Sequence, residues 1–199
     1  GLGPYSYRTS ADNGATWSSP VTGGTWAANA WVSGAGQGAE TPQVGVDAAG
    51  NAVAIWREWD GSAYQVYVAD RPVGGAWGTP QALTTGSSYA NTPALAVSAD
   101  GTAVATWSRY DGSHIRIWAA VRAASGTWGT PTAISAAGSH ALNPAIAMDG
   151  SGNAVAAWEQ GGVASARYSG GTWGSPQTVV AGGGDQARVA MNATGETAL

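Results

Sequence analysis

The chain has 199 residues, which is enough for one large domain or two small ones. It contains no cysteine, which excludes disulfides, thiolate metal sites and cysteine nucleophiles. Only 10% of its residues are charged and its net charge is −4, which argues against a nucleic-acid partner, and no apolar run is long enough to insert into a membrane. Because the chain begins without methionine or a signal-like segment, we expect a processed chain or a piece of a longer one.

The first predicted elements are two short strands within 5–21, the second of which carries Trp17-Ser18-Ser19-Pro20. The segment 22–41 that follows lies outside any repeat and carries Trp26 and Trp31. We interpret this segment as an insertion loop whose two tryptophans either contact a ligand or cover neighbouring structure.

From residue 41 onward the sequence repeats, and the repeat decides the architecture. The segment Thr41–Trp56 recurs as Thr92–Trp107 and as Asn143–Trp158, in steps of 51 residues. A truncated fourth copy runs from Gln186 to Leu199. A second block of the form Trp-Gly-x-Pro follows each full copy and begins at Trp77, Trp128 and Trp173.

Each full copy predicts four short strands. Strand one, which a glycine-containing turn follows, is Gln43–Asp47, Ala94–Ser98 or Ala145–Asp149. Strand two runs to Trp56, Trp107 or Trp158, and strand three covers Val66–Arg71, Ile115–Arg122 or Val163–Arg167. Strand four carries the Trp-Gly-x-Pro block, whose proline belongs on a sheet edge.

Both faces of these predicted sheets are apolar. Along strand two, the small side chains of Ala52 and Ala54 alternate with the larger Val53 and Ile55. An open sheet with a solvated face would alternate apolar with polar residues instead. Bulky-on-small packing between successive four-stranded sheets is typical of a β-propeller.

We therefore predict an all-β single domain over 1–199 that forms a β-propeller of about four four-stranded blades. The blades are about 42–84, 93–135 and 144–180, and the last blade is closed by 186–199 together with 5–21. Three arrangements fit this count: a closed four-bladed ring, an assembly of two chains into a larger ring, and a fragment of a longer array. The end at Leu199, two positions before the expected tryptophan, favours a structural or assembly unit, either a piece of a larger surface protein or a subunit that polymerises.

The segment Ser10-Ala11-Asp12-Asn13-Gly14-Ala15-Thr16-Trp17 matches the pattern S-x-D-x-G-x-T-W, and degenerate copies end at Trp77, Trp128 and Trp173. Along nearly its whole length, the chain resembles the Asp-box (BNR-type) repeats of sialidase-like β-propellers. The resemblance implies a folding element, in which Asp12 caps a hairpin turn and Trp17 packs beneath it.

The resemblance does not carry sialidase activity to this chain. That enzyme fold has six blades and a triad of arginines, which four blades cannot match residue by residue. In this sequence one arginine occupies the same place in every blade, at Arg8, Arg71, Arg122 and Arg167. We expect these arginines to bridge neighbouring blades rather than to converge on one ligand.

The loops opposite the tight turns vary between the copies, and the candidate ligand-binding residues lie there. They are Arg57, Glu58, Trp59, Asp60, Arg109, Tyr110, Asp111, Trp26, Trp31 and Tyr89. The third copy shortens this loop to Glu159–Gly162, and the inter-blade loops add His140 and Asp185. An aromatic ring beside charged side chains is typical of a sugar site, because the ring stacks on C–H groups while the charges bind hydroxyls.

Structural interpretations compete for several of these residues. Asp60 and Asp111 each precede a glycine, and for both we favour a plain hairpin turn. Trp56, Trp107 and Trp158 end strand two at equivalent positions, which favours a role in the core.

Catalysis and metal binding receive little support from the sequence. A glycosidase needs two carboxylates about 5 to 10 Å apart, for which Glu58, Asp60, Asp111 and Glu159 are the candidates on one face. His114 and His140 are isolated, and we interpret Asp149–Asn153 as a hairpin rather than a calcium loop. We predict no catalytic residue, no metal and no cofactor.

The function predicted from the sequence is a non-catalytic, lectin-like module that binds glycans, secreted or on a bacterial cell surface. A structural or assembly unit that self-associates is the alternative, and a glycoside hydrolase is the third hypothesis.

Overall fold

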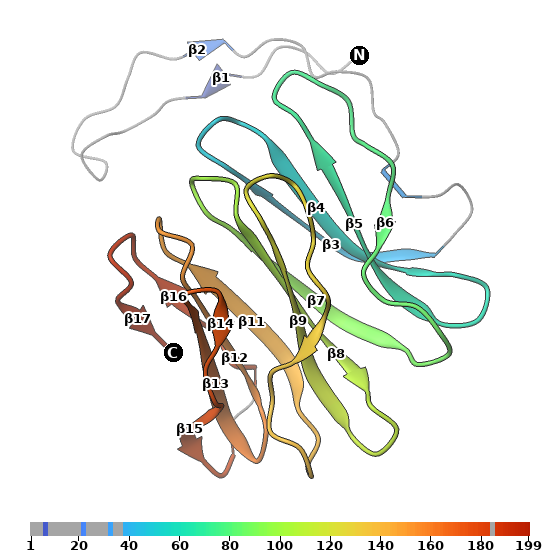
Figure 1. Cartoon of the computed structure of the whole chain (residues 1–199), viewed down its shortest axis with the longest axis vertical. Helices are drawn as coiled ribbons and strands as arrows, with labels where there is room; N and C mark the ends of the chain where they lie inside the picture. Colours follow the sequence, from blue (N-terminus) through green and yellow to red (C-terminus); the bar gives the residue numbers. More distant parts are fainter. Residues whose placement is uncertain (1–5, 8–20, 23–31, 34–37, 184–185) are drawn as a thin grey trace. The chain divides into compact units, whose positions relative to one another are not determined.

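The structure is a computed structural model that describes residues 6–7, 21–22, 32–33, 38–183 and 186–199. The chain divides into two units, 1–31 and 32–199. Every regular element in the described residues is a strand, so the all-β prediction is confirmed (Figure 1). In the first unit, β1 (Ser6–Tyr7) pairs antiparallel with β2 (Val21–Thr22).

The second unit contains three large antiparallel sheets, which follow one another along the chain (Figure 1). Sheet I consists of β3 (Ala39–Val46), β4 (Ala52–Trp59), β5 (Tyr64–Arg71) and β6 (Gln81–Ala82). Sheet II consists of β7 (Ala90–Val97), β8 (Ala103–Tyr110), β9 (Ile115–Arg122) and β10 (Thr132–Ala133). Sheet III consists of β11 (Leu142–Met148), β12 (Ala154–Glu159), β13 (Gly162–Ser169), β14 (Thr172–Trp173) and β15 (Gln177–Ala181). A further pair, β16 (Ala190–Met191) and β17 (Thr197–Ala198), belongs to the truncated fourth copy.

The strand boundaries differ from the prediction at several places. Strand one begins earlier than predicted, at Ala39, Ala90 and Leu142. Strand two does not stop at Trp56, because β4 continues to Trp59 and pairs with β5 along its whole length. Strand four of sheet I is β6, which begins after Pro80 instead of containing the Trp-Gly-x-Pro block. Proline has no N–H to donate to a neighbouring strand, so pairing resumes only beyond it.

Successive sheets pack face to face. Strand β7 contacts β3, β4 and β5 of the preceding sheet, and β11 contacts β7, β8 and β9 in the same way. Gly45 on β3 lies so close to Val97 of β7 that any side chain at residue 45 would collide with it. The alternation of small and large residues therefore allows the sheets to approach each other closely.

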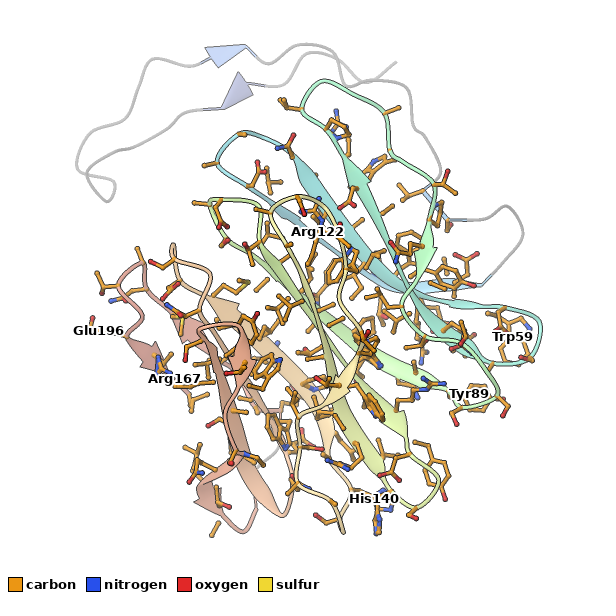
Figure 2. All side chains as sticks on the ribbon, in the orientation of Figure 1. Trp59, Tyr89, Arg122, His140, Arg167 and Glu196 are labelled. Carbon is orange, nitrogen blue, oxygen red and sulfur yellow. The ribbon has the colours of Figure 1, made fainter. Side chains whose placement is uncertain are left out.

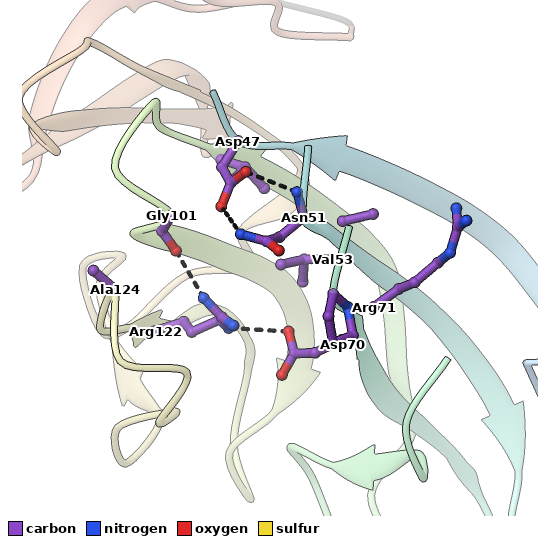
Figure 3. Close-up of a pocket in the computed structure, with 11 residues that line it drawn as sticks. Asp47, Asn51, Val53, Asp70, Arg71, Gly101, Arg122 and Ala124 are labelled. Carbon is purple, nitrogen blue, oxygen red and sulfur yellow. Dashed lines mark hydrogen bonds and ion pairs between the residues drawn. The ribbon is translucent and has the colours of Figure 1, made fainter. Parts of the chain in front are cut away.

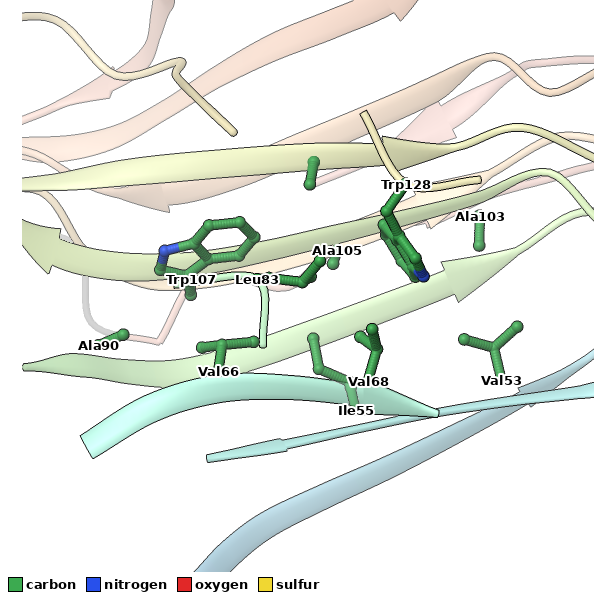
Figure 4. Close-up of a cluster of buried hydrophobic side chains, with 11 residues drawn as sticks. Val53, Ile55, Val66, Val68, Leu83, Ala90, Ala103, Ala105, Trp107 and Trp128 are labelled. Atoms are coloured by element: carbon green, nitrogen blue, oxygen red, sulfur yellow. The ribbon is translucent and has the colours of Figure 1, made fainter. Parts of the chain in front are cut away.

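The core between sheets I and II is filled by branched side chains of one sheet and an indole of the other (Figure 4). Ile55 and Val66 of sheet I face Trp107 of sheet II, and all three are fully buried. Sheets II and III repeat this arrangement with Ile117 and Trp158. The interpretation of Trp56, Trp107 and Trp158 as core residues agrees with their exposures of 4%, 0% and 0%.

In three of the four copies the tight turn after the first strand is held by one side chain at the same register position, whereas sheet II has Ser98 there and Asp100 accepts from the Thr102 backbone. Asp47 accepts hydrogen bonds from the backbone N–H groups of Ala49 and Asn51, at 2.9 and 2.8 Å. Asp149 accepts equivalent bonds in sheet III, and Asn192 does so between β16 and β17. The Asp149 turn is thus the hairpin that the sequence predicted.

The predicted fourth blade is represented by its two ends. The pairing of Tyr7 with Val21 follows Pro20 just as the pairing of Val68 with Gln81 follows Pro80, so β1 and β2 correspond to strands three and four. The closing of this blade by the two chain ends, and the number of blades, stay predictions. On β3 the side chains of Val44 and Val46 remain 59% and 58% exposed, whereas the equivalent side chains of β7 pack on sheet I.

Candidate functional site

The two ends of the sheets have different chemistry. At the tight-turn end, Arg122 of sheet II forms an ion pair with Asp70 of sheet I at 3.0 Å and donates to the Gly101 carbonyl at 2.7 Å (Figure 3). These residues surround a cavity of about 140 Å³ together with the Asp47 turn (Figure 3). Because its polar groups bind one another, this end serves to hold the sheets together.

The expectation for the repeated arginines holds in part. Arg122 bridges sheets I and II, and Arg167 of sheet III donates to the Gly195 carbonyl between β16 and β17 at 2.9 Å. Arg71 instead donates to Gly75 within its own sheet at 3.0 Å. Arg8 lies outside the described residues, as do the Asp-box residues Ser10–Trp17, the loop tryptophans Trp26 and Trp31, and Asp185.

At the opposite end, the first strands of all four copies surround one cavity of about 330 Å³, here called the axial cavity. Its wall contains four residues at the start of these strands that adopt positive φ without being glycine. They are Thr41 (51°), Thr92 (47°), Asn143 (50°) and Gln186 (58°). The first three lie in β-bulges, where the strand pairing shifts. Positive φ costs a non-glycine residue about 1–3 kcal/mol, so each copy maintains a strained backbone at the cavity.

A charged network stands beside the axial cavity in sheet I. Arg57 forms an ion pair with Glu40 and donates a hydrogen bond to Asn91 of sheet II. The Tyr64 hydroxyl donates to Glu40 at 2.9 Å, and the Arg57 guanidinium lies 4.6 Å from the centre of the Tyr64 ring. The hydrogen bonds from Arg57 and Tyr64 hold the pKa of Glu40 below its usual range, so this carboxylate stays ionised in mild acid.

A second carboxylate reaches the axial cavity from sheet III. Glu159, the last residue of β12, accepts hydrogen bonds at Oε1 from the Asn143 side chain at 3.0 Å and from the Gln186 backbone at 2.6 Å. Both donors line the cavity. Glu159 occupies the position in sheet III that Arg57 occupies in sheet I and Ser108 in sheet II, so the repeat presents three different chemistries here.

The predicted aromatic residues gather at the same end. Trp59 lies 5.5 Å from Tyr64 and 6.1 Å from Tyr89 between ring centres (Figure 2). Tyr89 is 51% exposed and Tyr110 is 46% exposed. These rings offer flat apolar surfaces close to the charged network, and their role in ligand binding stays a prediction.

Several predicted residues are occupied by structural bonds. Glu58 is buried and accepts a 2.6 Å hydrogen bond from the Trp56 indole. Asp60 accepts from the backbone of Ser62 and Ala63, and Asp111 accepts from the backbone of Ser113 and His114. Arg57, Glu58 and Trp59 belong to β4, and Arg109 and Tyr110 to β8, so the predicted loops reduce to short turns.

A comparison of all ten carboxylates in the described residues leaves two that lie next to residues of the axial-cavity wall, one preceding Thr41 and one bonded to Asn143 and Gln186. Six belong to turns, at Asp47, Asp60, Asp100, Asp111, Asp149 and Glu196. Asp70 holds Arg122 at the opposite end, and Glu58 is buried on an indole. Glu40 and Glu159 remain. Sequence reasoning missed Glu40, whose signal is its register: the same position holds Asn91 and Leu142 in the next copies.

The two histidines, isolated in the sequence, lie together in the structure. His114 and His140 are 5.2 Å apart between ring centres, and the His140 Nδ1 atom accepts a hydrogen bond from Ile115. No set of three side chains suitable for a metal ion occurs in the described residues. Within the same part of the chain, no helix could cross a membrane.

No family model matches the chain, and no curated protein matches it. Among solved structures, it is similar to an alpha-L-arabinanase of Penicillium chrysogenum complexed with arabinobiose, with a TM-score of 0.52 and 10% identity over 94% of this chain and 58% of that chain. It also matches a structure from the GH130 family, which contains glycoside hydrolases that target beta-1,2 mannosidic linkages, with 14% identity and a TM-score of 0.49 over 73% of this chain and 52% of that chain. A glycosyl hydrolase from Bacteroides ovatus matches with 13% identity and a TM-score of 0.47 over 73% of this chain and 52% of that chain. The chain thus spans less than two thirds of the length of each of these enzymes.

The likeness to the arabinanase is one of fold, and that enzyme is a five-bladed β-propeller. The separate, face-packed sheets of this chain are accordingly propeller-like, while membership in the Asp-box family stays a prediction. The prediction of a non-catalytic, lectin-like module was wrong: the solved structure that shares the fold at a TM-score of 0.52 is that of an enzyme, an alpha-L-arabinanase. The sequence analysis considered Glu159 only as one of several carboxylates and did not consider Glu40.

Proposed function

We propose that this protein is a glycoside hydrolase, or part of one, whose reaction takes place at the axial cavity between Glu40 and Glu159. The single observation that carries the proposal is the arrangement of carboxylates. Of the ten in the described residues, these two alone combine a position beside the cavity with freedom from turns and cores. They come from different sheets, as a pair that flanks a substrate must.

The two carboxylates have different surroundings, which suits a division of roles. Arg57 and Tyr64 keep Glu40 ionised, as a general base or nucleophile requires. Glu159 accepts hydrogen bonds at Oε1 from Asn143 and Gln186, both of which line the cavity. In this assignment Glu159 is the general acid.

Other residues at the same end of the sheets also suit a glycan. Trp59 and Tyr89 provide ring faces on which sugar C–H groups stack, and the neighbouring polar side chains can bind hydroxyls. The likeness in fold to an arabinanase supports a polymeric glycan as substrate. Since such polymers lie outside cells, we also propose that the protein is secreted or held at a cell surface.

The experiment is a hydrolysis screen of the full chain against arabinan, β-1,2-mannan and other oligosaccharides, read as new reducing ends. On any substrate that is turned over, Glu40→Gln and Glu159→Gln should each lower kcat by about 10²- to 10⁴-fold, the usual contribution of a general acid or base. Glu196→Gln, a change at the Asn192 turn, is the matched control and should keep full activity. Equal turnover by the wild type and both cavity variants would overturn the assignment.

A further inference from the structure

Sheet II differs from sheets I and III in the residue that stands two positions after the buried tryptophan. In sheet I the buried Trp56 indole donates to Glu58 at 2.6 Å, and in sheet III the Trp158 indole donates to Gln160 at 3.1 Å. The equivalent pair in sheet II is Trp107 and Arg109. Arginine has no acceptor, so the acceptor that the repeat normally supplies is missing here.

The consequence is two buried donors without an acceptor. The Trp107 Nε1 atom and the Arg109 Nε atom have no hydrogen-bond partner among the described residues. Trp107 is fully buried, and its indole nitrogen lies at the end of the ring toward Ala90 (Figure 4). A buried donor without an acceptor destabilises the fold, and an unpaired charge does so more strongly, so an acceptor that reached either group would be favoured.

Arg109, like Arg71 and Arg167, has no ion-pair partner among the described residues. Arg57, Arg116 and Arg122 each form an ion pair with a carboxylate, whereas the one protein partner recorded for Arg109 is the Thr85 carbonyl, which accepts from Nη2. Its positive charge is therefore not balanced by a carboxylate in the described part of the chain.

A cavity of about 470 Å³ opens beside this guanidinium. Its wall contains Arg109, the exposed rings of Tyr89 and Tyr110, and the hydroxyls of Ser87 and Ser88, and none of the described residues that line it is acidic. The volume falls within the range of about 300–1,000 Å³ of small-molecule sites. A cation, two aromatic rings and hydroxyls together suit a sugar that carries an anionic group.

We propose that this cavity is a subsite for a sugar residue bearing a carboxylate, a hexuronate, bound by the Arg109 guanidinium between Tyr89 and Tyr110. The planar guanidinium matches a carboxylate in a two-bond fork, and Arg109 lines the cavity without a carboxylate partner of its own among the described residues. The inference rests on the proposed function in taking a glycan as ligand, and it narrows the substrate to acidic glycans.

The test measures binding by calorimetry with a trigalacturonate and with its methyl ester, which keeps the sugar and removes the charge. Arg109→Gln places in sheet II the residue that sheet III already has, so the variant should fold and melt no lower than the wild type. The affinity of Arg109→Gln for trigalacturonate should be about 10- to 100-fold lower than that of the wild type, which corresponds to the loss of a hydrogen bond to a charged group. Its affinity for the methyl ester should change little. Arg71→Gln, at an arginine that bonds within its own hairpin, is the control and should bind as the wild type.

Two results would overturn the proposal: equal affinity of the wild type for acid and ester, or unchanged affinity for the acid in Arg109→Gln. Free acetate that binds as well as trigalacturonate would also overturn it, because the cavity would then recognise any anion. Every protein in this binding experiment also carries Glu159→Gln, so that binding does not depend on turnover, and the wild type is here the protein that keeps Arg109. Arg109-dependent binding without hydrolysis would refute the proposed function alone, and hydrolysis of neutral glycans without uronate binding would refute the subsite alone.

Discussion

The two ends of the repeated sheets obey different rules. At the tight-turn end, Asp47, Asp149 and Asn192 perform the same task with the same backbone hydrogen bonds. At the axial-cavity end, one register position holds Arg57, Ser108 and Glu159 in turn. What the fold needs is thus repeated at one end, and what could carry chemistry varies at the other.

The largest effect on stability should come from the core that lies between these ends. Trp158→Ala removes a fully buried indole and should lower the free energy of unfolding by about 3–5 kcal/mol, measured by urea denaturation. Tyr89→Ala, at a half-exposed ring of the cavity end, should cost no more than about 0.5 kcal/mol. Comparable losses of stability in the two variants would contradict the claim that the core, and not the cavity end, stabilises the fold.

The close approach of sheets I and II gives the next effect. Gly45→Val places a branched side chain where Val97 already lies and should destabilise the fold by about 1–3 kcal/mol or more. Gly61→Val is the control for a glycine with open space around it, though its positive φ of 103° adds some backbone strain. Thermal unfolding separates the collision with Val97 from the backbone strain. Adding Val97→Ala should restore the melting temperature of Gly45→Val and leave that of Gly61→Val unchanged.

Asp149→Ala should remove the hydrogen bonds that hold one tight turn, at a cost of about 1–2 kcal/mol near neutral pH. The side-chain bond from Asn153 is the main cause that keeps the pKa of Asp149 below its usual value. A lowered folded-state pKa stabilises the fold above the ordinary aspartate pKa, near about 4, and this stabilisation is lost as the pH falls through the folded-state pKa. The stability difference between Asp149→Ala and the wild type should therefore shrink in acid, and a constant difference down to pH 2 would refute this cause.

The smallest predicted change is a shift in a pH profile. Arg57→Gln removes the main group that lowers the pKa of Glu40, so that pKa should rise toward the usual glutamate value. If Glu40 acts as an ionised carboxylate, the acidic limb of the profile of kcat/KM against pH should move to higher pH. Tyr64→Phe should move it in the same direction by less, and Arg71→Gln should leave it in place.

The sequence predicted the architecture well because repetition constrains it. The copies of 51 residues and the alternation around Val53 and Ile55 were sufficient to predict the strand order and the packing of successive sheets. The length of strand two was missed because the apolar alternation ends at Trp56, while β4 continues with the polar Arg57 and Glu58.

The candidate site was harder to predict, for two physical reasons. Glu40 and Glu159 are 119 residues apart, and each lies next to wall residues of the same cavity only because the first strands gather around it. The positive φ values of Thr41 and Thr92 have no sequence signal, because threonine disfavours that conformation. An alignment of the copies would have singled out both carboxylates as positions where the repeat changes its chemistry.

The most direct test of this account compares one carboxylate from each end, by turnover and melting temperature on the same preparations. Glu159→Gln should lose about 10²- to 10⁴-fold in kcat with little change in melting temperature. Asp149→Asn, which places the asparagine of the fourth copy at a tight turn, should keep its activity. Full activity in Glu159→Gln, or a loss of equal size in Asp149→Asn, would contradict the claim that the chemistry lies at the axial cavity.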